Sequence, residues 1–268
     1  TGHELSARKW SPDGIPLWFD GDRYAILKVG RTAQLYDIEA GHPLATLRGH
    51  ADSISHAEFS ADGRRVLTAA TEGTVKVWDA ATGSEICTIE AHTVSWDPQF
   101  SADGQRIVTA ARSSGTVKVW DAATGRALRI LDMGPGSEVG CVAFSPDGQR
   151  VVAGNGSGAI CVWDAQDGQE LLRLHGHNDL IIDVNYSPDG QRILSASFDH
   201  TAKVWDAVTG RELLTLRGPE SVLFASFSPD GRRIVTSNGD KTVTIWEAAS
   251  EEEAATDAAT TAQWLAAS

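Results

Sequence analysis

The second half of the chain holds the three residue types of a catalytic triad. Ser195 offers a hydroxyl, His177 an imidazole that can remove its proton, and Asp199 a carboxylate that can orient the imidazole. An enzyme would be expected to carry such a set once, yet incomplete copies recur along the chain. The copies are His50, Thr68, Glu72 and Trp78; His92, Thr109 and Trp120; and Thr236, Asp240 and Trp246. The recurrence favours a structural role in a repeated unit and predicts no catalytic residue.

Two histidines separated by one residue, His175 and His177, are a second possible source of chemistry, because imidazole is a common metal ligand. His177 belongs to the repeated set, however, and His175 ends a predicted strand. The three cysteines, Cys87, Cys141 and Cys161, also lack metal-site spacing. We therefore expect no metal and no cofactor, and we interpret the cysteines as buried reduced thiols of a cytoplasmic protein.

The repeat is the strongest signal in the sequence. The motif Val-Trp-Asp or a close variant recurs with its aromatic residue 42, 42, 43, 42 and 41 residues apart. These aromatic residues are Tyr36, Trp78, Trp120, Trp163, Trp205 and Trp246. A near-constant period of this length indicates that one supersecondary unit is repeated.

One unit contains four short apolar runs separated by turn residues. In the fifth unit the runs are 181–186, 192–196, 201–205 and 212–216, which is strand length. Ser-Pro-Asp-Gly at 187–190 joins the first two runs, and its Asp-Gly pair supplies the positive φ of a tight hairpin. Four-stranded units arranged radially make a β-propeller, in which each sheet is covered by its neighbours.

These repeats and their Ser-Pro-Asp-Gly hairpins resemble the WD-repeat family, in its bacterial form, over residues 1–249. The resemblance implies that His177, Ser195, Asp199 and Trp205 form one buried hydrogen-bonded chain, in which the hydroxyl both donates and accepts. It also implies that partners bind at the end of the propeller that carries the His and Asp turns. It says little about function, because one fold serves many functions.

We predict an all-β fold: a single six-bladed propeller of four-stranded antiparallel blades over residues 1–249, followed by an acidic, alanine-rich tail over residues 250–268 that forms a short helix or linker. In the favoured interpretation residues 3–8 are the outermost strand of the last blade and close the ring, because residues 1–5 resemble residues 209–213. In the alternative, residues 5–10 are the first inner strand. Both give six blades.

Turns on a rigid scaffold are favoured recognition sites, so partner-binding residues are expected in the turns before the inner and third strands. They are Asp52, Ser53, Thr71, Ser95, Trp96, Arg112, Ser113, Glu138, Asp179, Leu180, Phe198, Glu220 and Asn238. Phe198 is either a binding anchor or packs against a neighbouring blade. Trp96 and Pro98 interrupt the third inner strand, and proline cannot donate to a ladder, so strand pairing there is expected to be distorted.

The net charge of −13 and the lack of basic clusters argue against binding to duplex nucleic acid. No apolar run is long enough to span a bilayer. We therefore expect a monomer that binds a protein or peptide partner, with no nucleic acid and no membrane.

The expected function is a non-catalytic scaffold that binds a protein or peptide on the top face or in the central channel, as the docking or sensor module of a larger protein. One alternative is an enzyme acting in the channel, for which the inner strands offer only His56, Asp97 and Asp183. Another is a structural or engineered propeller without a ligand.

Overall fold

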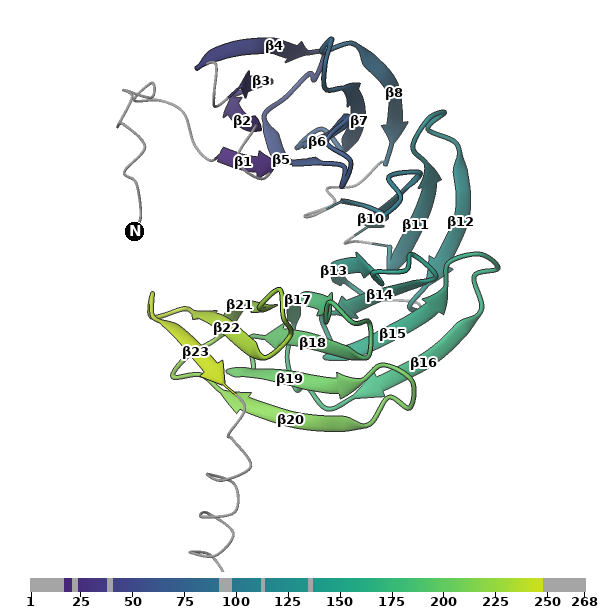
Figure 1. The fold of residues 1–268 in the computed structure, drawn as a ribbon. Helices are drawn as coiled ribbons and strands as arrows, with labels where there is room; N and C mark the ends of the chain where they lie inside the picture. The colour runs from purple at the N-terminus through teal and green to yellow at the C-terminus, as the bar shows by residue number, and fades with distance from the viewer. Residues whose placement is uncertain are drawn as a thin grey trace, which may run out of the picture.

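The computed structural model describes residues 17–20, 24–37, 41–91, 98–111, 114–134 and 137–247. These residues form six antiparallel sheets of three or four strands and no helix, so the all-β prediction is confirmed (Figure 1). It follows that these ranges contain no helix long and apolar enough to cross a membrane.

Each sheet is built from consecutive strands of the chain. The first three sheets are β1 (Leu17–Asp20), β2 (Tyr24–Val29), β3 (Thr32–Asp37) and β4 (His42–Arg48); β5 (Ile54–Phe59), β6 (Arg65–Ala70), β7 (Thr74–Asp79) and β8 (Glu85–Glu90); and β9 (Gln99–Phe100), β10 (Arg106–Ala111), β11 (Thr116–Asp121) and β12 (Ala127–Asp132). The last three are β13 (Val139–Phe144), β14 (Arg150–Asn155), β15 (Ala159–Asp164) and β16 (Glu170–His175); β17 (Ile181–Tyr186), β18 (Arg192–Ser197), β19 (Thr201–Asp206) and β20 (Glu212–Arg217); and β21 (Val222–Phe227), β22 (Arg233–Asn238) and β23 (Val243–Glu247).

The hairpin between the first and second strands has the same chemistry in successive sheets. In the fifth sheet Gly190 adopts a φ of 69°, which glycine tolerates without strain. The Ser187 hydroxyl donates to Asp189, and the Arg192 backbone N–H donates to the Ser187 Oγ over 2.9 Å. The Ser-Pro-Asp-Gly signal therefore specifies a real turn, and the strands on either side begin where the sequence predicts.

Arginine side chains tie neighbouring sheets together at these hairpins. Arg65 donates to the Gly104 carbonyl of the next sheet over 2.8 Å, and Arg106 donates to the Gly148 carbonyl over 2.7 Å. In each case an arginine at the start of a second strand reaches the following hairpin. These hydrogen bonds, together with the apolar packing, hold neighbouring sheets at a fixed spacing.

The hydrophobic core lies between the sheets. Five clusters of buried side chains each join two successive sheets, from the first pair to the last. In the cluster between the fourth and fifth sheets, for example, Ile160 and Val162 pack with Ile193 and Trp205. Each sheet is therefore stabilised by the apolar surface that its neighbour covers, as expected for a propeller-like repeat.

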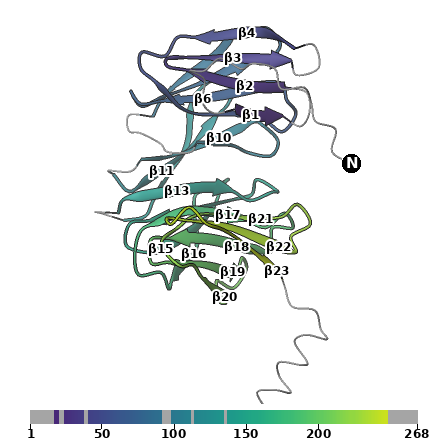
Figure 2. The ribbon, with the colours of Figure 1, turned by 90° about the vertical axis from the view of Figure 1, so that its left-hand side faces the viewer.

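The described residues form an arc. Figures 1 and 2 show β1–β4 and β21–β23 at its two ends, with the first strands of the sheets on the inner side. Val243 and Ile245 on the last sheet are 66% and 68% exposed, whereas the corresponding Ala202 and Val204 are 0% and 4% exposed. One face of β21–β23 is therefore not covered by any of the six described sheets.

The expected four strands are described in five sheets, and in the last sheet the described residues supply three. The predicted closing strand at 3–8, its alternative at 5–10 and the tail at 250–268 lie outside the described residues, so closure stays a prediction. β1 (Leu17–Asp20) is the inner strand of the first sheet, in agreement with the favoured interpretation. In the third sheet β9 pairs with β10 at Gln99 and Phe100, and residues 92–97 lie outside the described residues, so the distortion expected around Trp96 stays a prediction.

Candidate functional site

The predicted hydrogen-bonded chain is present in the fifth sheet. The His177 Nε2 lies 2.7 Å from the Ser195 Oγ, and Trp205 donates its indole N–H to the same oxygen over 2.9 Å. The His177 Nδ1 lies 2.8 Å from Asp199. We assign the tautomer in which Nδ1–H donates to Asp199 and Nε2 accepts the Ser195 proton, since this satisfies every group. Ser195 is fully buried, so a substrate has no access to its hydroxyl.

The second sheet repeats the same arrangement with two conservative replacements. The His50 Nε2 lies 2.8 Å from the Thr68 Oγ1, which also accepts the indole N–H of Trp78 over 2.7 Å. The His50 Nδ1 lies 2.9 Å from Glu72. The serine and aspartate of one sheet are thus replaced by threonine and glutamate in another, as expected for a group that stabilises each blade.

The environment shifts the pKa of each ionisable member in a defined direction. Burial lowers the pKa of His177 and outweighs the hydrogen bond to Asp199, which acts in the opposite sense. Burial likewise lowers the pKa of His50. Burial alone would raise the pKa of Glu72, but hydrogen bonds from Thr74 and His50 lower it to about 2. Each network therefore pairs a neutral imidazole with a carboxylate.

Mild acid is expected to destabilise the protein through these histidines. The unfolded chain binds protons at histidine near pH 6.5, whereas the folded state resists protonation because its histidine pKa values are lowered. The unfolded state therefore holds more protons below this pH, and the free energy of unfolding falls as the pH drops from 6.5 toward the folded pKa. Urea unfolding at pH 7.5, 6.5 and 5.5 measures the slope.

A matched pair of variants assigns this slope to a residue. His177→Gln is expected to lower stability at pH 7.5 and to flatten the dependence on pH, because one titrating group has been removed. His175→Gln, which changes an exposed histidine two residues away, is the matched control. Identical slopes in all three proteins would contradict the assignment.

The described turns among those predicted to bind a partner lie at one end of the sheets. Within one sheet, the turn before the first strand is hydrogen-bonded to the turn before the third strand. The Thr71 N–H donates to the Ser53 carbonyl over 3.0 Å, and the Phe198 N–H donates to the Leu180 carbonyl over the same distance. The sequence thus pairs these turns correctly.

The individual residues differ in their exposure. Asp52, Ser53, Thr71, Glu138, Asp179 and Glu220 are exposed, whereas Leu180 and Phe198 are half-buried. Asn238 is buried, and its amide donates to the Thr242 Oγ1 over 3.0 Å. Ser95, Trp96, Arg112 and Ser113 lie outside the described residues. The structure brings Leu180 and Phe198 to the rim of a pocket that is lined by residues of the inner strands.

A β-bulge recurs in the inner strands at one repeat position. The register shifts between Ile54 and His56 in β5, and at the corresponding positions of β13, β17 and β21. Such a bulge leaves one residue outside the ladder and re-aims the next side chain. The residues that follow the bulge, which we call the axial ring residues, are His56, Cys141, Asp183 and Phe224.

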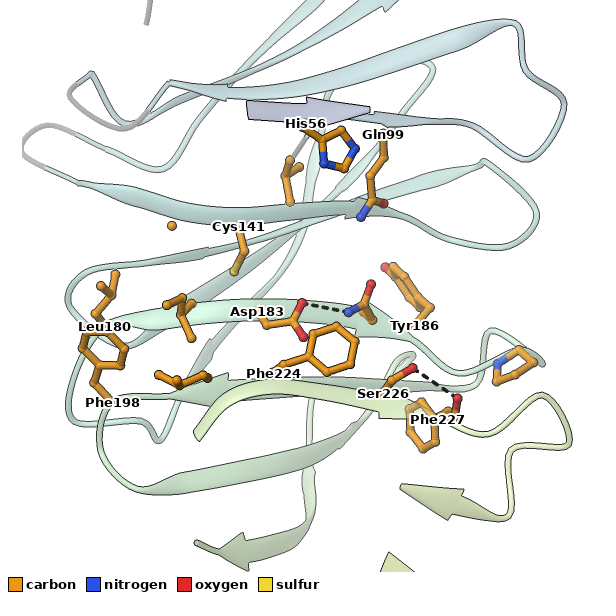
Figure 3. A pocket seen from close by; sticks show the side chains of 16 residues that line it. His56, Gln99, Cys141, Leu180, Asp183, Tyr186, Phe198, Phe224, Ser226 and Phe227 are labelled. Carbon is orange, nitrogen blue, oxygen red and sulfur yellow. Dashed lines mark hydrogen bonds between the residues drawn. The ribbon is translucent and has the colours of Figure 1, made fainter. Parts of the chain in front are cut away.

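All four axial ring residues line one cavity, the axial pocket, on the inner side of the arc (Figure 3). Its volume is about 730 Å³, within the usual range of ligand pockets. Figure 3 shows Leu180 and Phe198 at one end, Tyr186 and Phe227 at the other, and Asp183 and Phe224 between them. The surface is therefore mainly apolar, with a few polar groups among aromatic rings.

Two polar groups give the pocket its chemistry. The Asp183 carboxylate accepts hydrogen bonds from the Asn185 amide over 2.8 Å and from the Ala225 N–H over 3.0 Å, which joins β17 to β21. The Tyr186 hydroxyl is buried without a hydrogen-bond partner among the described residues, and burial raises the pKa of Tyr186. The phenol is therefore neutral and can donate to an incoming acceptor.

Metal binding finds no support in this part of the chain. Within the described ranges, no group of three or more His, Cys, Asp or Glu side chains is arranged to hold a metal ion. Burial raises the pKa of the Cys161 thiol to about 12, so this sulfur is protonated at neutral pH. The three described cysteines are free thiols.

Phe224, Tyr186 and Phe227 line the pocket although the sequence did not indicate them as site residues. A signal was present: in the four described inner strands that carry the bulge, the third position holds four different residue types, although most core positions repeat. His56 and Asp183 had been considered as candidates for an enzyme, and both line the axial pocket. Asp97 lies outside the described residues.

Comparison with known proteins corrects the family expected from the sequence. The family model described as outer membrane protein assembly factor BamB, a family of PQQ-type repeats, matches residues 1–257. No curated protein matches the chain. The WD-repeat identification is therefore wrong, because a repeat of about 42 residues with Asp-Gly hairpins specifies the four-stranded blade and not the family that uses it. By this match the chain belongs to the family of the outer membrane protein assembly factor BamB.

Proposed function

We propose that the protein is a non-catalytic interaction module that binds a segment of a partner protein in the axial pocket and on the turns beside it. The family is consistent with a protein-interaction or scaffold role. The observation that carries the proposal is the exposed apolar surface on the inner side of the arc. Phe224 is 47% exposed and the adjacent Leu223 is 40% exposed, in a cavity where exposed apolar groups mark binding sites.

The pocket fits an extended segment with a protruding side chain. Its volume accommodates one or two large side chains, and its walls come from several sheets whose relative positions are fixed by the buried clusters. The turns at Leu180 and Phe198 extend the surface outward at one end (Figure 3). A partner bound there would contact both rigid strands and adaptable turns.

Truncation of Phe224 is expected to weaken partner binding about 30-fold or more, the effect of removing a central aromatic anchor. Peptides selected from a phage-displayed random library on the wild-type protein serve as ligands, and fluorescence polarisation measures their affinity for Phe224→Ala. The side chain is half in solvent, so its truncation should leave the unfolding transition nearly unchanged.

Leu213→Ala is the matched control, because Leu213 is 42% exposed on the outermost strand of the fifth sheet, away from the pocket. Its affinity should equal that of the wild type. Selected peptides that bind Phe224→Ala and the wild type equally would refute the axial pocket as the binding site.

The remaining expectations stay predictions within this proposal: a monomer, a cytoplasmic location, no nucleic acid, no membrane and no cofactor. The closing of the arc by residues 3–8 belongs with them. None of these is needed for the pocket to bind a partner segment.

A further inference from the structure

Two turns of the fifth sheet form one end of the axial pocket. Leu180 comes just before the inner strand β17, and Phe198 lies in the turn before the third strand β19, with both side chains half-buried at the rim (Figure 3). The other described residues that line the pocket lie on inner strands, except for Pro188 in the Ser-Pro-Asp-Gly hairpin. The shape of this end therefore depends on how the two turns are held.

The Asp199 carboxylate is the acceptor that both turns share. Its Oδ2 accepts the Asn178 N–H over 3.0 Å, in the turn that leads to Leu180. Its Oδ1 accepts the Thr201 N–H over 3.0 Å and the Thr201 hydroxyl over 2.6 Å, in the turn that carries Phe198. One side chain therefore fixes the two turns relative to each other.

His177 orients this carboxylate from the interior of the blade. Its Nδ1 lies 2.8 Å from the Asp199 Oδ2, and its Nε2 is held by Ser195. The His177 side chain is 0% exposed and that of Asp199 is 8% exposed. Hydrogen bonds to a charged acceptor are strong, and the shielding from water strengthens them further. The buried chain thus continues from the core of the blade to the rim of the pocket.

Three further hydrogen bonds join the same turns to one another and to the next sheet. The Phe198 N–H donates to the Leu180 carbonyl over 3.0 Å, and the Ser197 hydroxyl donates to the Asp179 carbonyl over 3.1 Å. Ser221, which precedes the inner strand of the sixth sheet, donates its hydroxyl to the Phe198 carbonyl over 3.4 Å. The rim is therefore one hydrogen-bonded unit.

The second sheet contains the same unit away from the pocket. Glu72 accepts the Ala51 N–H over 3.3 Å and the Asp52 N–H over 3.1 Å, and the His50 Nδ1 lies 2.9 Å from it. Residues 51–53 and 71–73, which form these turns, do not line the axial pocket. The two sheets share the network, and they differ in whether its turns reach the pocket.

We propose that Asp199 and His177 are positioning residues of the axial pocket, which hold the turns of Leu180 and Phe198 in the shape that receives the partner segment. This inference rests on the proposed function and adds residues that act through their neighbours. A rim fixed before binding avoids the loss of conformational freedom that ordering two turns would cost the complex. The network of the fifth sheet thus contributes to affinity as well as to stability.

Loss of the shared acceptor tests this role. Asp199→Ala is expected to weaken the library-selected peptides about tenfold, because the two turns lose their common support. Glu72→Ala removes the equivalent carboxylate from the second sheet and should leave affinity within about twofold of the wild type, since its turns lie away from the pocket. Fluorescence polarisation measures binding, and urea unfolding measures the stability of each variant.

Asp199→Glu is the rescue variant. Glu72 shows that a glutamate at this repeat position reaches both the histidine and the N–H groups of the turn. Affinity in Asp199→Glu is therefore expected to return to within about threefold of the wild type.

A matched pair of histidine variants decides the question if Asp199→Ala does not fold. His177→Gln keeps the carboxylate but removes the imidazole that orients it, and is expected to weaken binding about threefold. His50→Gln makes the same change in the second sheet and should leave the affinity unchanged. Both histidines are buried in equivalent networks, so both variants should lose similar stability. A purely structural role predicts equal affinities for the two.

The outcomes separate positioning from stability. A loss of affinity confined to the fifth-sheet variants supports the proposal, as does recovery in Asp199→Glu. If the fifth-sheet and second-sheet variants weaken the peptides equally, or not at all, the network only stabilises its blade and the proposal is overturned. Peptides that bind Phe224→Ala and the wild type equally would instead refute the proposed function, and the positioning role with it.

Discussion

Replacement of Trp205 by alanine is expected to lower the free energy of unfolding by about 3–5 kcal/mol, the usual cost of truncating a buried aromatic side chain. Trp205 is 2% exposed and packs in the cluster between the fourth and fifth sheets. Its removal leaves a cavity there. It also removes the indole N–H that donates to Ser195, which loosens the chain that holds His177.

Trp246 provides a matched comparison within the same molecule. It donates to the Thr236 Oγ1 over 3.0 Å in the same geometry, but it is half-buried in the last sheet, whose other face none of the described sheets covers. Trp246→Ala should therefore cost less, about 1–2 kcal/mol. Urea unfolding followed by far-UV circular dichroism measures both. Equal losses would show that the deeper burial of Trp205 does not increase its contribution to stability.

The strands and turns are predictable because their chemistry is local and repeated. Asp189 and Gly190 specify a hairpin whatever surrounds them, and the same pair returns in successive sheets. The buried network is predictable for a related reason: His177, Ser195 and Asp199 keep their spacing within one blade. Residues that serve every unit recur at the same position of each repeat, so the sequence shows them several times.

The axial pocket is not predictable in the same way, because it forms only where strands far apart in the sequence converge. His56 and Phe224 line one cavity although 168 residues separate them. A repeat is recognised by its constant positions, whereas the four axial ring residues are of four different types. In a repeated fold, the side chains most able to distinguish a partner are those that depart from the repeat.

The exposed apolar face of the last sheet is also a consequence of the repeat. Ile245 is apolar because its counterparts, such as Val204, are buried between sheets, and the repeat carries this pattern to the end of the array. Sequence alone cannot show whether a given copy has a neighbour. Stability is therefore expected to decrease toward the last sheet, which the described sheets cover on one face.

Replacement of Gly158 by alanine is expected to be the second severe change, with a loss of about 3 kcal/mol. Gly158 joins β14 to β15 with a φ of 81°, a conformation that costs a side chain about 1–3 kcal/mol. An added Cβ would also overlap the backbone carbonyl of His177, so the turn or the network histidine must move.

Gly30→Ala is the control, since Gly30 has a φ of 55° and no atom within 4 Å of an added Cβ. Its loss, about 1 kcal/mol in urea unfolding, reports the backbone cost alone. The difference between the two losses in free energy of unfolding is the cost of disturbing the close contact between Gly158 of the fourth sheet and the His177 backbone. Equal losses would show that this contact contributes nothing to stability.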